Sequence, residues 1–534
     1  MHFCLHRILK GGLTVGIYLN PDNIDFQMAL NSEIYVDKSE LIKQTNAQIY
    51  TEQRFICVSR PRRFGKSMAA NMLAAYYSRG CDSKEMFSKY KISADPTFEK
   101  HLNKYNVIHI NMVNFLGESK NIDEMIQFIC EDIIDEVIEQ YSDLNMPRRK
   151  TLLNVLNKAF AQYKIPFIFI IDEWDCVFRE LKNDKDSQEK YLDFLRDTLK
   201  DQSYVALAYM TGILPIKKYG KHSALNMFTE IAMTNTREYS EFTGFTEAEV
   251  QALCEKYNMP FEETKRWYDG YDLKGVSIYN PRSVVMSMTG HDFDSYWTST
   301  ETYEALKVYI QMNFDGLREK VVDMIAGEKV SVNTGKFQND MSTFNSADDV
   351  LTLLIHLGYL TYNDGKVWIP NSEVQQEFIN SIEDGGWETV MNAIRSSDEL
   401  IEATINGDEE NVARMVEKAH DENASIIGYN NETSLSCVIS LAYYSARKEY
   451  IIHRELATGK GFADLVFIPR KTSDKPAMVI ELKWDKSADT AIEQIKRKQY
   501  TDKISEYVGD ILLVGINYDT ESKKHSCMIE KIVK

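Results

Sequence analysis

The strongest constraint on the fold is a series of continuous apolar runs in the first 240 residues that alternate with stretches of helical composition. The runs are RFICV from Arg54 to Val58, NVIHINM from Asn106 to Met112, PFIFIID from Pro166 to Asp172 and YVALAYMTG from Tyr204 to Gly212. Such runs suit strands of a parallel sheet, because helices cover both faces of these sheets. The alternation of strand and helix therefore predicts an α/β domain.

Length and composition indicate a globular protein of several domains. The chain has 534 residues, with 44% hydrophobic and 27% charged residues, and it is longer than one hydrophobic core usually serves. Its eight cysteines form no CxxC pair and no zinc-ligand spacing, which favours reduced thiols. Because no apolar run reaches the ~20 residues of a membrane span and the start lacks a signal-peptide core, we predict a cytoplasmic protein without a membrane partner.

Charge is distributed unevenly along the chain. The formal net charge is −18, which argues against a protein coated in basic surface, because phosphate contacts need clustered Lys and Arg. From residue 425 onward, 17 Lys and Arg stand against 15 Asp and Glu, so this part carries +2 and the preceding part −20. We therefore expect nucleic acid to approach the C-terminal part, and the acidic remainder to suit a protein partner or a homo-oligomer.

The segment RPRRFGKS, between the first apolar run and a helical stretch, has the second half of a phosphate-binding loop. Gly65 would let backbone N–H groups approach phosphate, Lys66 would reach the β and γ phosphates, and the Ser67 hydroxyl would ligate Mg²⁺. Arg60 stands where the usual first glycine is found. These residues predict a nucleotide site, and the alternative is a turn that opens an ordinary helix.

The third apolar run ends in two acids, as a Walker-B element does. We expect Asp172 to hold the magnesium shell and Glu173 to orient or deprotonate the attacking water. The alternative is an acidic strand end that faces solvent. At the end of the next run, Thr211 is a candidate polar sensor for the γ-phosphate, and a simple strand-ending turn accounts for it equally well.

Three arginines precede the glycine of the phosphate loop. Arg60, Arg62 and Arg63 are candidates for clamping phosphate or for acting on a neighbouring subunit. Surface or salt-bridged arginines are the alternative, and the more common one.

Six motifs together resemble the predicted AAA-ATPase-like family of bacteria and archaea. They are YVDKS at 35–39, RPRRFGKS at 60–67, IDEWD at 171–175, TGI at 211–213, WYDGY at 267–271 and YNPRS at 279–283. The resemblance covers roughly residues 18–287 and implies a P-loop core of the ASCE type, ATP as ligand, and a helical, winged-helix-like lid. Because the family shares the departure at Arg60, that departure does not imply a dead site.

A second constellation lies near the C-terminus, where the runs IIHRELA, FADLVFIP, AMVIELKW and DILLVGINY predict strands and AIEQIKRKQYTDKI predicts a helix. Glu481 and Lys483, two residues apart on one strand, point to the same face, whereas Leu482 points into the core. Asp464 and Glu481 would hold one or two Mg²⁺ ions, or Mn²⁺, at a scissile phosphate. Lys483 would stabilise or deprotonate the nucleophile, and Glu432 would complete the metal shell. The alternative is the exposed face of an edge strand.

From about residue 425 to the end, the chain resembles the PD-(D/E)XK nuclease domain that commonly follows the same ATPase-like domain. Asp464, Glu481 and Lys483 match its metal and catalytic positions, Glu432 matches the helix acid, and Gln494 matches the polar position of the following helix. The resemblance implies a magnesium-dependent nuclease that acts on DNA or another nucleic acid.

The helix that carries Gln494 has further candidates near its end. Tyr500 lies near the expected position of a partner tyrosine, but its spacing from Gln494 is looser than QxxxY. Lys496, Arg497 and Lys498 are candidates for contacting a DNA backbone, with a solvated helix face as the equal alternative.

The segment LTLLIHLGYLTYNDGKVWIP from Leu351 to Pro370 predicts a helix followed by a hairpin with an NDG turn, the pattern of a small wing-like element.

These observations predict an α/β multidomain protein. Its expected segments are a disordered extension over 1–16, an AAA-like P-loop ATPase domain over 17–240, a helical winged-helix-like lid over 241–330, a helical connecting region over 331–424 and a PD-(D/E)XK nuclease-like domain over 425–534. The predicted function is an ATPase coupled to a nuclease. The alternative is a STAND-like ATP switch or sensor whose nuclease fold binds without cutting. A third interpretation, a scaffold with neither activity, requires that both groups of acids and lysine arose by chance.

Overall fold

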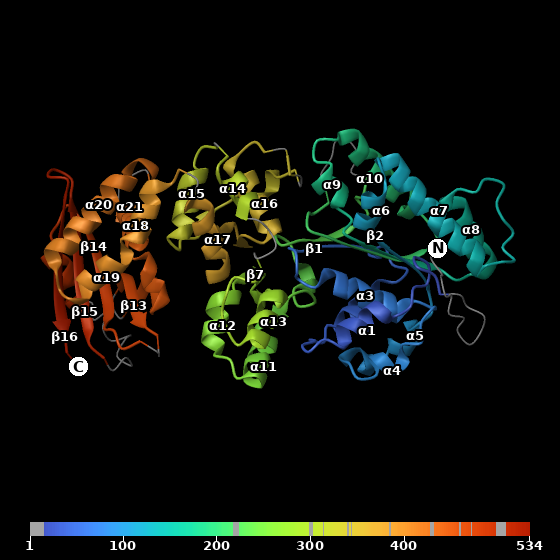
Figure 1. Cartoon of the computed structure of the whole chain (residues 1–534), viewed down its shortest axis with the longest axis horizontal. Coiled ribbons are helices and arrows are strands. Elements are labelled where there is room, and N and C mark those ends of the chain that lie inside the picture. Colours follow the sequence, from blue (N-terminus) through green and yellow to red (C-terminus); the bar gives the residue numbers. More distant parts are fainter. Residues whose placement is uncertain are drawn as a thin grey trace. The chain divides into compact units, whose positions relative to one another are not determined.

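The computed structural model (Figure 1) describes residues 15–216, 224–297, 303–312, 314–338, 341–342, 344–383, 386–427, 432–458, 461–470, 473–497 and 509–533. The chain forms two compact units. The N-terminal unit comprises residues 1–302 and 331–374, and the C-terminal unit comprises residues 303–330 and 375–534. Within the described residues, no helix has both the length and the apolar character required to cross a membrane. The seven cysteines in this part of the chain are free.

A five-stranded sheet in the order β2-β3-β4-β1-β5 forms the centre of the N-terminal unit, and all of its strands pair in parallel. The strands are β1 (Phe55–Ser59), β2 (Asn106–Asn111), β3 (Phe167–Asp172), β4 (Val205–Gly212) and β5 (Thr229–Ile231). Every residue of β1, β3 and β4 is buried, as continuous apolar runs require in a sheet covered on both faces. The predicted parallel α/β sheet is confirmed, and β5 is a strand that the sequence did not indicate.

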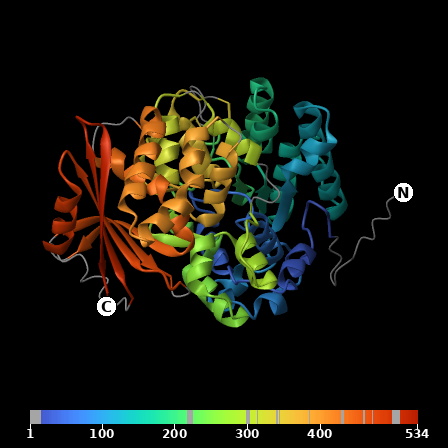
Figure 2. The same cartoon turned by 60° about the vertical axis from the view of Figure 1, so that its left-hand side comes forward.

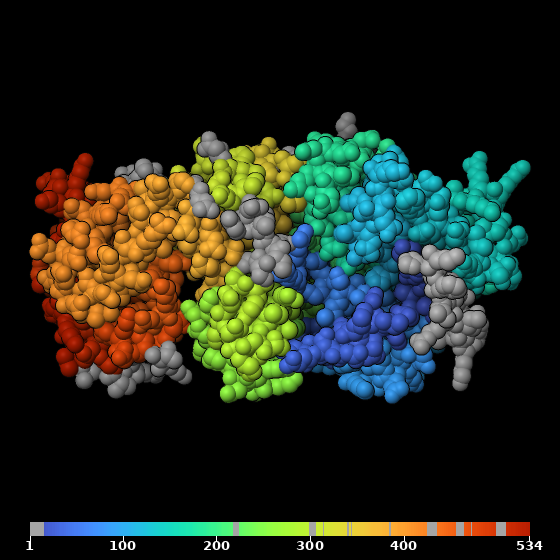
Figure 3. Space-filling view, viewed as in Figure 1, coloured from blue at the N-terminus to red at the C-terminus, as the bar shows by residue number. Residues whose placement is uncertain are grey.

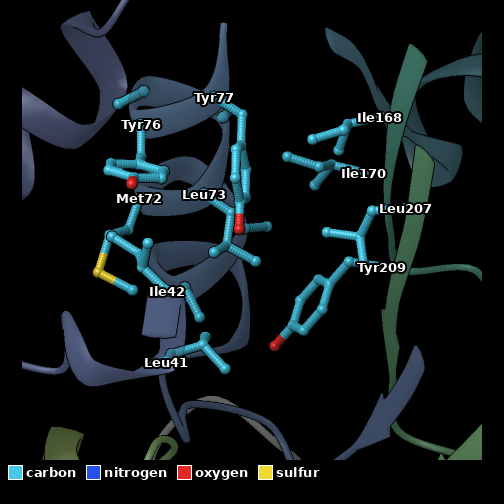
Figure 4. Close-up of a cluster of buried hydrophobic side chains, with 14 of the residues drawn as sticks. Leu41, Ile42, Met72, Leu73, Tyr76, Tyr77, Ile168, Ile170, Leu207 and Tyr209 are labelled. Atoms are coloured by element: carbon cyan, nitrogen blue, oxygen red, sulfur yellow. The ribbon is translucent and has the colours of Figure 1, made fainter. Parts of the chain in front are cut away.

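Helices cover both faces of this sheet, with α1, α3, α4 and α5 on one side and α6 to α10 on the other (Figure 1). Figure 4 shows Leu73 and Tyr77 of α3 facing Ile170 of β3 and Tyr209 of β4 in one buried cluster. The helices are α1 (Ile24–Leu30), α2 (Glu40–Gln48), α3 (Lys66–Tyr77), α4 (Lys84–Phe87), α5 (Phe98–His101), α6 (Met112–Glu118), α7 (Ile122–Gln140), α8 (Leu152–Tyr163), α9 (Cys176–Glu180) and α10 (Lys185–Leu199). This packing fixes the start of α3 at the carboxyl ends of the strands.

A small lid follows the sheet within the same unit. Its sheet has the order β6-β8-β7, and its elements are β6 (Phe245–Thr246), β7 (Tyr271–Leu273), β8 (Val276–Tyr279), α11 (Glu247–Tyr257), α12 (Phe261–Tyr268) and α13 (Pro281–Gly290). Thr246 and Glu249 form a capping box that starts α11. Ile34 and Val36 from the N-terminal segment pack into the lid core. The green lobe of α11 to α13 accordingly lies against the blue N-terminal segment in Figure 3.

A helix and a hairpin occupy residues 347–368, where the sequence predicts a wing-like element. They are α16 (Ala347–Leu357), β10 (Thr361–Asn363) and β11 (Lys366–Trp368). The turn residues Asp364 and Gly365 have φ values of 44° and 75°, the left-handed conformation that a tight hairpin turn requires and that Asp-Gly accommodates. The predicted hairpin with its NDG turn is confirmed.

The sheet of the C-terminal unit has the order β12-β13-β14-β15-β16. Only β14 and β15 pair in parallel, and the other three pairings are antiparallel. The strands are β12 (Tyr450–Thr458), β13 (Gly461–Pro469), β14 (Ala477–Trp484), β15 (Ile511–Asp519) and β16 (Lys524–Ile532). The first four were predicted from the sequence, and β16 was not.

Each face of this second sheet has its own core. Leu482 and its neighbours pack with α19 to α21, and α22 covers the opposite face through Ile492 and Ile495, so that the sheet stands between helices (Figure 2). The elements that follow the lid, besides those above, are α14 (Tyr303–Ile310), α15 (Leu317–Ile325), β9 (Val330–Ser331), α17 (Ser372–Glu383), α18 (Glu388–Arg395), α19 (Ser397–Ile405), α20 (Glu409–Ile427), α21 (Glu432–Ala442) and α22 (Ala488–Arg497). The predicted helical middle region and C-terminal α/β fold are confirmed.

Candidate active sites

The phosphate loop lies between the buried strand β1 and helix α3. Gly65 precedes α3 with φ of 83°, a left-handed conformation that favours glycine. No atom lies within 4 Å of the position that a Cβ on Gly65 would take, so the space beside it is open. Ser67 is exposed in the first turn of α3, where free backbone N–H groups and the helix dipole favour an anion. The local geometry therefore suits a phosphate group.

Lys66 is the buried cation of this loop. Its side chain is only 4% exposed, and its Nζ donates to the carbonyl oxygen of Pro61 at 3.0 Å. Burial lowers the pKa of Lys66, and the carboxylates of Glu173, Asp175 and Asp172 oppose that shift. A buried ammonium with a single neutral partner is poorly compensated, so an anionic ligand at this position would be strongly favoured.

The acids predicted for a Walker-B element lie where β3 ends. Asp172 is 3% exposed, and its Oδ1 accepts hydrogen bonds from the Thr211 hydroxyl and from the backbone N–H of Glu173. Glu173 has φ of 53° and lines the same pocket as Lys66. Burial raises the pKa of Glu173, while Lys66 and Arg179 act to lower it. The fold thus brings the predicted lysine, acid pair and threonine of this site together.

A pocket of about 520 Å³ joins the phosphate loop to the lid. Gly65, Lys66, Ser67 and Glu173 lie along it, and its apolar wall is formed by Ile34, Tyr35, Phe242, Phe245, Val285 and Met286. An apolar wall with a few polar groups at one end is the usual form of a small-molecule site. The Ser67 hydroxyl and the Asp172 carboxylate are hard oxygen donors, which fit Mg²⁺.

Lys38 of the YVDKS motif lines this pocket and connects the N-terminal segment to the start of the lid, a role that the sequence did not reveal. Its Nζ donates to the carbonyl of Glu241 at 2.8 Å and to Glu249 Oε2 at 2.6 Å. Glu249 also belongs to the capping box of α11. The only sequence signal for this contact was the position of Lys38 inside a family motif.

The three arginines of the loop separate in the structure. Arg60 is fully buried and donates to Thr243 Oγ1 and to the carbonyls of Ser59 and Ile231 at 3.0–3.2 Å. Burial lowers its pKa to about 10. A surface or ion-paired arginine is thus the wrong interpretation for this position, since Arg60 braces the end of β1.

Arg62 and Arg63 also differ from each other. Arg62 is exposed and lines the pocket beside the phosphate loop. Arg63 is half-buried and donates to the carbonyls of Tyr296 and Trp297. Nucleotide contact by these two side chains stays a prediction, and Arg62 is the better placed of the two.

The second constellation lies on one face of the C-terminal sheet. β13 pairs with β14 as far as Leu465 and Ile480, and because side chains alternate along a strand, the next residues, Asp464 and Glu481, point to the face opposite that of this pair. Glu481 is 1% exposed, and Asp464 Oδ2 accepts from the backbone N–H of Leu482 at 2.6 Å. Because β14 is the central strand of its sheet, the exposed edge-strand alternative is wrong.

Lys483 and Gln494 both contact the carboxylate of Glu481. Lys483 Nζ lies 2.8 Å from Glu481 Oε1 and also donates to the carbonyl of Leu482 at 2.9 Å. Gln494 reaches the same carboxylate from α22 through its Nε2. The sheet face and α22 therefore assemble four of the predicted residues, Asp464, Glu481, Lys483 and Gln494, into one cluster.

Asn517 is a further member of this cluster that sequence reasoning missed. It pairs with Lys483 in the parallel register of β14 and β15, is 3% exposed, and accepts from the backbone N–H of Lys486 at 3.0 Å. Its signal in the sequence was a single amide in the otherwise apolar run ILLVGIN. Asn517 holds the turn that directly follows β14.

The remaining predicted residues of this domain lie at its margins. Glu432 is the first residue of α21, and its side chain lies outside the described residues, as do Lys498 and Tyr500. Lys496 is exposed on α22 and forms an ion pair with Glu530 at 2.5 Å, and Arg497 is exposed beside it. Both remain near the cluster on the helix that carries Gln494.

The donor set of the cluster can be compared with the needs of a metal ion. Among the residues that the structure describes, no group of three or more His, Cys, Asp or Glu side chains converges. The cluster offers two carboxylates, Asp464 on β13 and Glu481 on the neighbouring strand β14. This number suits Mg²⁺, because the ion binds one or two carboxylates and keeps several waters. Asp464 and Glu481 therefore fit the predicted metal.

Comparison with known proteins matches both parts of the chain. Residues 25–220 match a family described as predicted AAA-ATPase, and residues 430–527 match the PD-(D/E)XK nuclease superfamily. An uncharacterized protein encoded in the vnfD 5′ region of Azotobacter chroococcum mcd 1 is 24% identical over 275 residues. That match covers 50% of this chain and 51% of the relative, so the chain spans about half the length of the curated relative it matches.

Two solved structures are also similar to the chain. A Walker-type ATPase of Pyrococcus abyssi is 13% identical with a TM-score of 0.34, and the match covers 64% of this chain and 94% of that one. The ORC2 protein of Aeropyrum pernix is 12% identical with a TM-score of 0.29, and the match covers 66% of this chain and 96% of that one. On the two family matches, the chain joins an AAA-ATPase-like domain to a C-terminal domain of the PD-(D/E)XK nuclease superfamily.

Proposed function

We propose that this protein hydrolyses ATP in its N-terminal unit and cleaves phosphodiester bonds of nucleic acid, DNA foremost, in its C-terminal unit. The convergence of Asp464, Glu481 and Lys483 on one buried sheet face carries the nuclease assignment. A buried glutamate beside a buried lysine is costly to maintain, and phosphodiester hydrolysis is a chemistry that uses such a pair together with a second acid. We place the protein in the cytoplasm, with a protein partner or a second copy of the chain as further partners.

ATP hydrolysis in the N-terminal unit follows from the residues around the pocket. The N–H groups at the start of α3 and the ammonium of Lys66 would hold the β and γ phosphates. Ser67 and Asp172 would hold Mg²⁺, which neutralises charge on the phosphates when bound. Glu173 lines the pocket and would orient a water and accept its proton as the water oxygen bonds to the γ-phosphorus. The bond from that phosphorus to the β,γ-bridging oxygen breaks in the same reaction, which releases ADP and phosphate.

In the C-terminal unit, the acids and the lysine would have different roles in phosphodiester cleavage. Asp464 and Glu481 would hold Mg²⁺, or Mn²⁺, which polarises the phosphate and acidifies a water when bound. Lys483 would stabilise the attacking oxygen, and Gln494 would fix the rotamer of Glu481 through the contact described above. The exposed Lys496 and Arg497 would approach the nucleic acid backbone, which is the usual role of basic side chains near such a site.

The decisive experiment is a cleavage assay on single- and double-stranded DNA and RNA with Mg²⁺ or Mn²⁺, with and without ATP, comparing wild type with Asp464→Ala. We expect metal-dependent cleavage that the variant lacks, and a cleavage rate that changes with ATP if the two activities are coupled. Cleavage that persists in Asp464→Ala would contradict the assigned site. No cleavage under any condition, with ATP hydrolysis present, would favour the ATP switch or sensor.

A further inference from the structure

Arg179 is a buried cation beside the acidic end of β3 that has no role in the function described so far. It lies in α9, six residues after Glu173, and its side chain is 9% exposed. Its guanidinium contacts the Glu173 carboxylate through NH2, and its Nε lies 3.3 Å from Asp175 Oδ2. One planar guanidinium thus bridges two carboxylates through different nitrogens of its fork.

Asp175 connects this bridge to the end of the neighbouring strand. Asp175 is fully buried, and its Oδ2 accepts from the backbone N–H groups of Ile213 and Leu214 at 3.0 and 2.8 Å. These residues directly follow Thr211 and Gly212 of β4, and the Thr211 hydroxyl contacts Asp172. The position of Arg179 is therefore set by the ends of two adjacent strands.

Glu173 needs such support because its backbone is in an unfavourable conformation. Its φ of 53° is unusual for a glutamate and persists only where neighbouring contacts determine it. The Arg179 guanidinium contacts the Glu173 carboxylate directly, whereas the ammonium of Lys66 is the group that a bound phosphate would engage.

We propose that Arg179 is a positioning residue for ATP hydrolysis, which holds the Glu173 carboxylate toward the pocket while Asp175 anchors its guanidinium. The inference rests on the proposed ATPase function. Arg179 acts through Glu173. Because Asp175 is held by the end of β4, its ion pair with Arg179 fixes the guanidinium relative to that strand end. Nucleotide binding itself does not depend on Arg179, since its contacts are made to protein carboxylates.

The test compares steady-state ATP hydrolysis by the full-length wild type, Arg179→Gln and Arg179→Lys, with nucleotide affinity measured separately. We expect Arg179→Gln to lower kcat roughly 10²-fold with little change in KM or in nucleotide affinity, as for other misplacements of a catalytic group. Arg179→Lys should recover part of kcat, because its ammonium can still contact the Glu173 carboxylate.

Two further variants keep the inference falsifiable. Arg179→Gln combined with Asp175→Asn removes the buried carboxylate that the single variant leaves uncompensated, so a folded protein can be assayed, and it should keep the lowered kcat with unchanged nucleotide affinity. Arg196→Gln, on the exposed face of α10 where Arg196 pairs with Asp193, is the matched control and should hydrolyse ATP as wild type does. A wild-type kcat in folded Arg179→Gln would overturn the inference alone. No hydrolysis by the wild type would overturn the proposed ATPase function and the inference with it.

Discussion

The two units each bury a lysine to the same extent and compensate it in different ways. Lys66 and Lys483 are both 4% exposed. Lys66 donates to a neutral carbonyl, that of Pro61, whereas Lys483 forms an ion pair with buried Glu481 and also donates to a carbonyl. In the N-terminal unit, the ammonium of Lys66 is therefore available to an anionic ligand. In the C-terminal unit, the charges of Lys483 and Glu481 compensate each other.

The difference follows from where each fold places its polar residues. In the N-terminal sheet they lie where parallel strands end, and Glu173, directly after Asp172 of β3, lines a pocket beside the start of α3. In the C-terminal sheet they lie within the strands, and Glu481 and Lys483 share a face that α22 covers. Polar residues at strand ends can be accessible to a ligand without interrupting the hydrophobic core. Charged residues within a buried strand need partners from the protein itself, because their burial is otherwise too costly.

The largest effect is expected for the lysine of the C-terminal unit. Lys483→Ala should lower metal-dependent cleavage by roughly 10²–10⁴-fold, the range in which a positioned proton-transfer group contributes. ATP affinity should stay that of the wild type, because the residues lining the nucleotide pocket belong to the other unit. The measurements are the cleavage rate at saturating Mg²⁺ and the ATP affinity, both on the same preparation; the first tests the expected loss and the second the expected absence of change. Normal cleavage would remove Lys483 from the catalytic assignment.

The lysine of the N-terminal unit should show the reverse pattern. Lys66→Ala should lower ATP hydrolysis by roughly 10²–10³-fold, since a donor to developing phosphate charge is lost, and leave cleavage in the absence of ATP unchanged. Lys84→Ala, which removes an exposed lysine paired with Glu99, is the matched control for loss of a positive charge. If Lys66→Ala also abolished cleavage without ATP, the separation of the two sites would be wrong.

Stability should distinguish the two lysines more directly than activity does. Lys483→Ala leaves the carboxylate of Glu481 buried without its cation, which should cost about 3–5 kcal/mol of unfolding free energy. Lys66→Ala removes one hydrogen bond to a carbonyl and should cost only about 1 kcal/mol. Chemical denaturation of the full chain, compared with the double variant Glu481→Gln, Lys483→Met, measures the difference. Equal losses in the two alanine variants would contradict the contrast drawn here.

Much of this architecture could be predicted from the sequence because its signals are local. Continuous apolar runs located β1 to β4 and β12 to β15, and the NDG turn located the hairpin after α16. The spacing of Glu481 and Lys483 predicted their shared face, and the burial of Leu482 is confirmed. These features depend on strand periodicity and turn chemistry, which a short segment carries by itself.

The features that the sequence did not reveal depend on contacts between distant segments. β16 has mixed polar residues and mostly exposed or half-buried side chains, so it lacks the apolar run that identified the other strands. Arg179 looks like an ordinary charged residue of a short helix until its two carboxylate partners are known. The domain limits and the chemical roles of the site residues stay predictions, because neither follows from the position of a side chain alone.

The smallest effect concerns a pair of histidines that gives the C-terminal unit a sensitivity to acid. His420 Nδ1 and His525 Nε2 lie 3.1 Å apart, both rings are buried, and Tyr518 packs against them. Burial lowers the pKa of both histidines, and His420 adds to the shift at His525. The folded state therefore binds fewer protons than the unfolded state below the ordinary histidine pKa of about 6.5, and stability is lost as pH falls from there.

Between pH 7 and pH 5 this pair should cost about 1 kcal/mol or more of unfolding free energy, since the unfolded histidines gain protons that the folded ones resist. Denaturation curves at the two pH values measure the loss in the wild type and in His420→Gln, His525→Gln, whose side chains do not titrate. We expect the double variant to lose much less stability on acidification, and His291→Gln, at the end of α13 in the other unit, to behave as wild type. An equal acid response in the wild type and the double variant would show that the buried pair is not the acid-sensitive element of its unit.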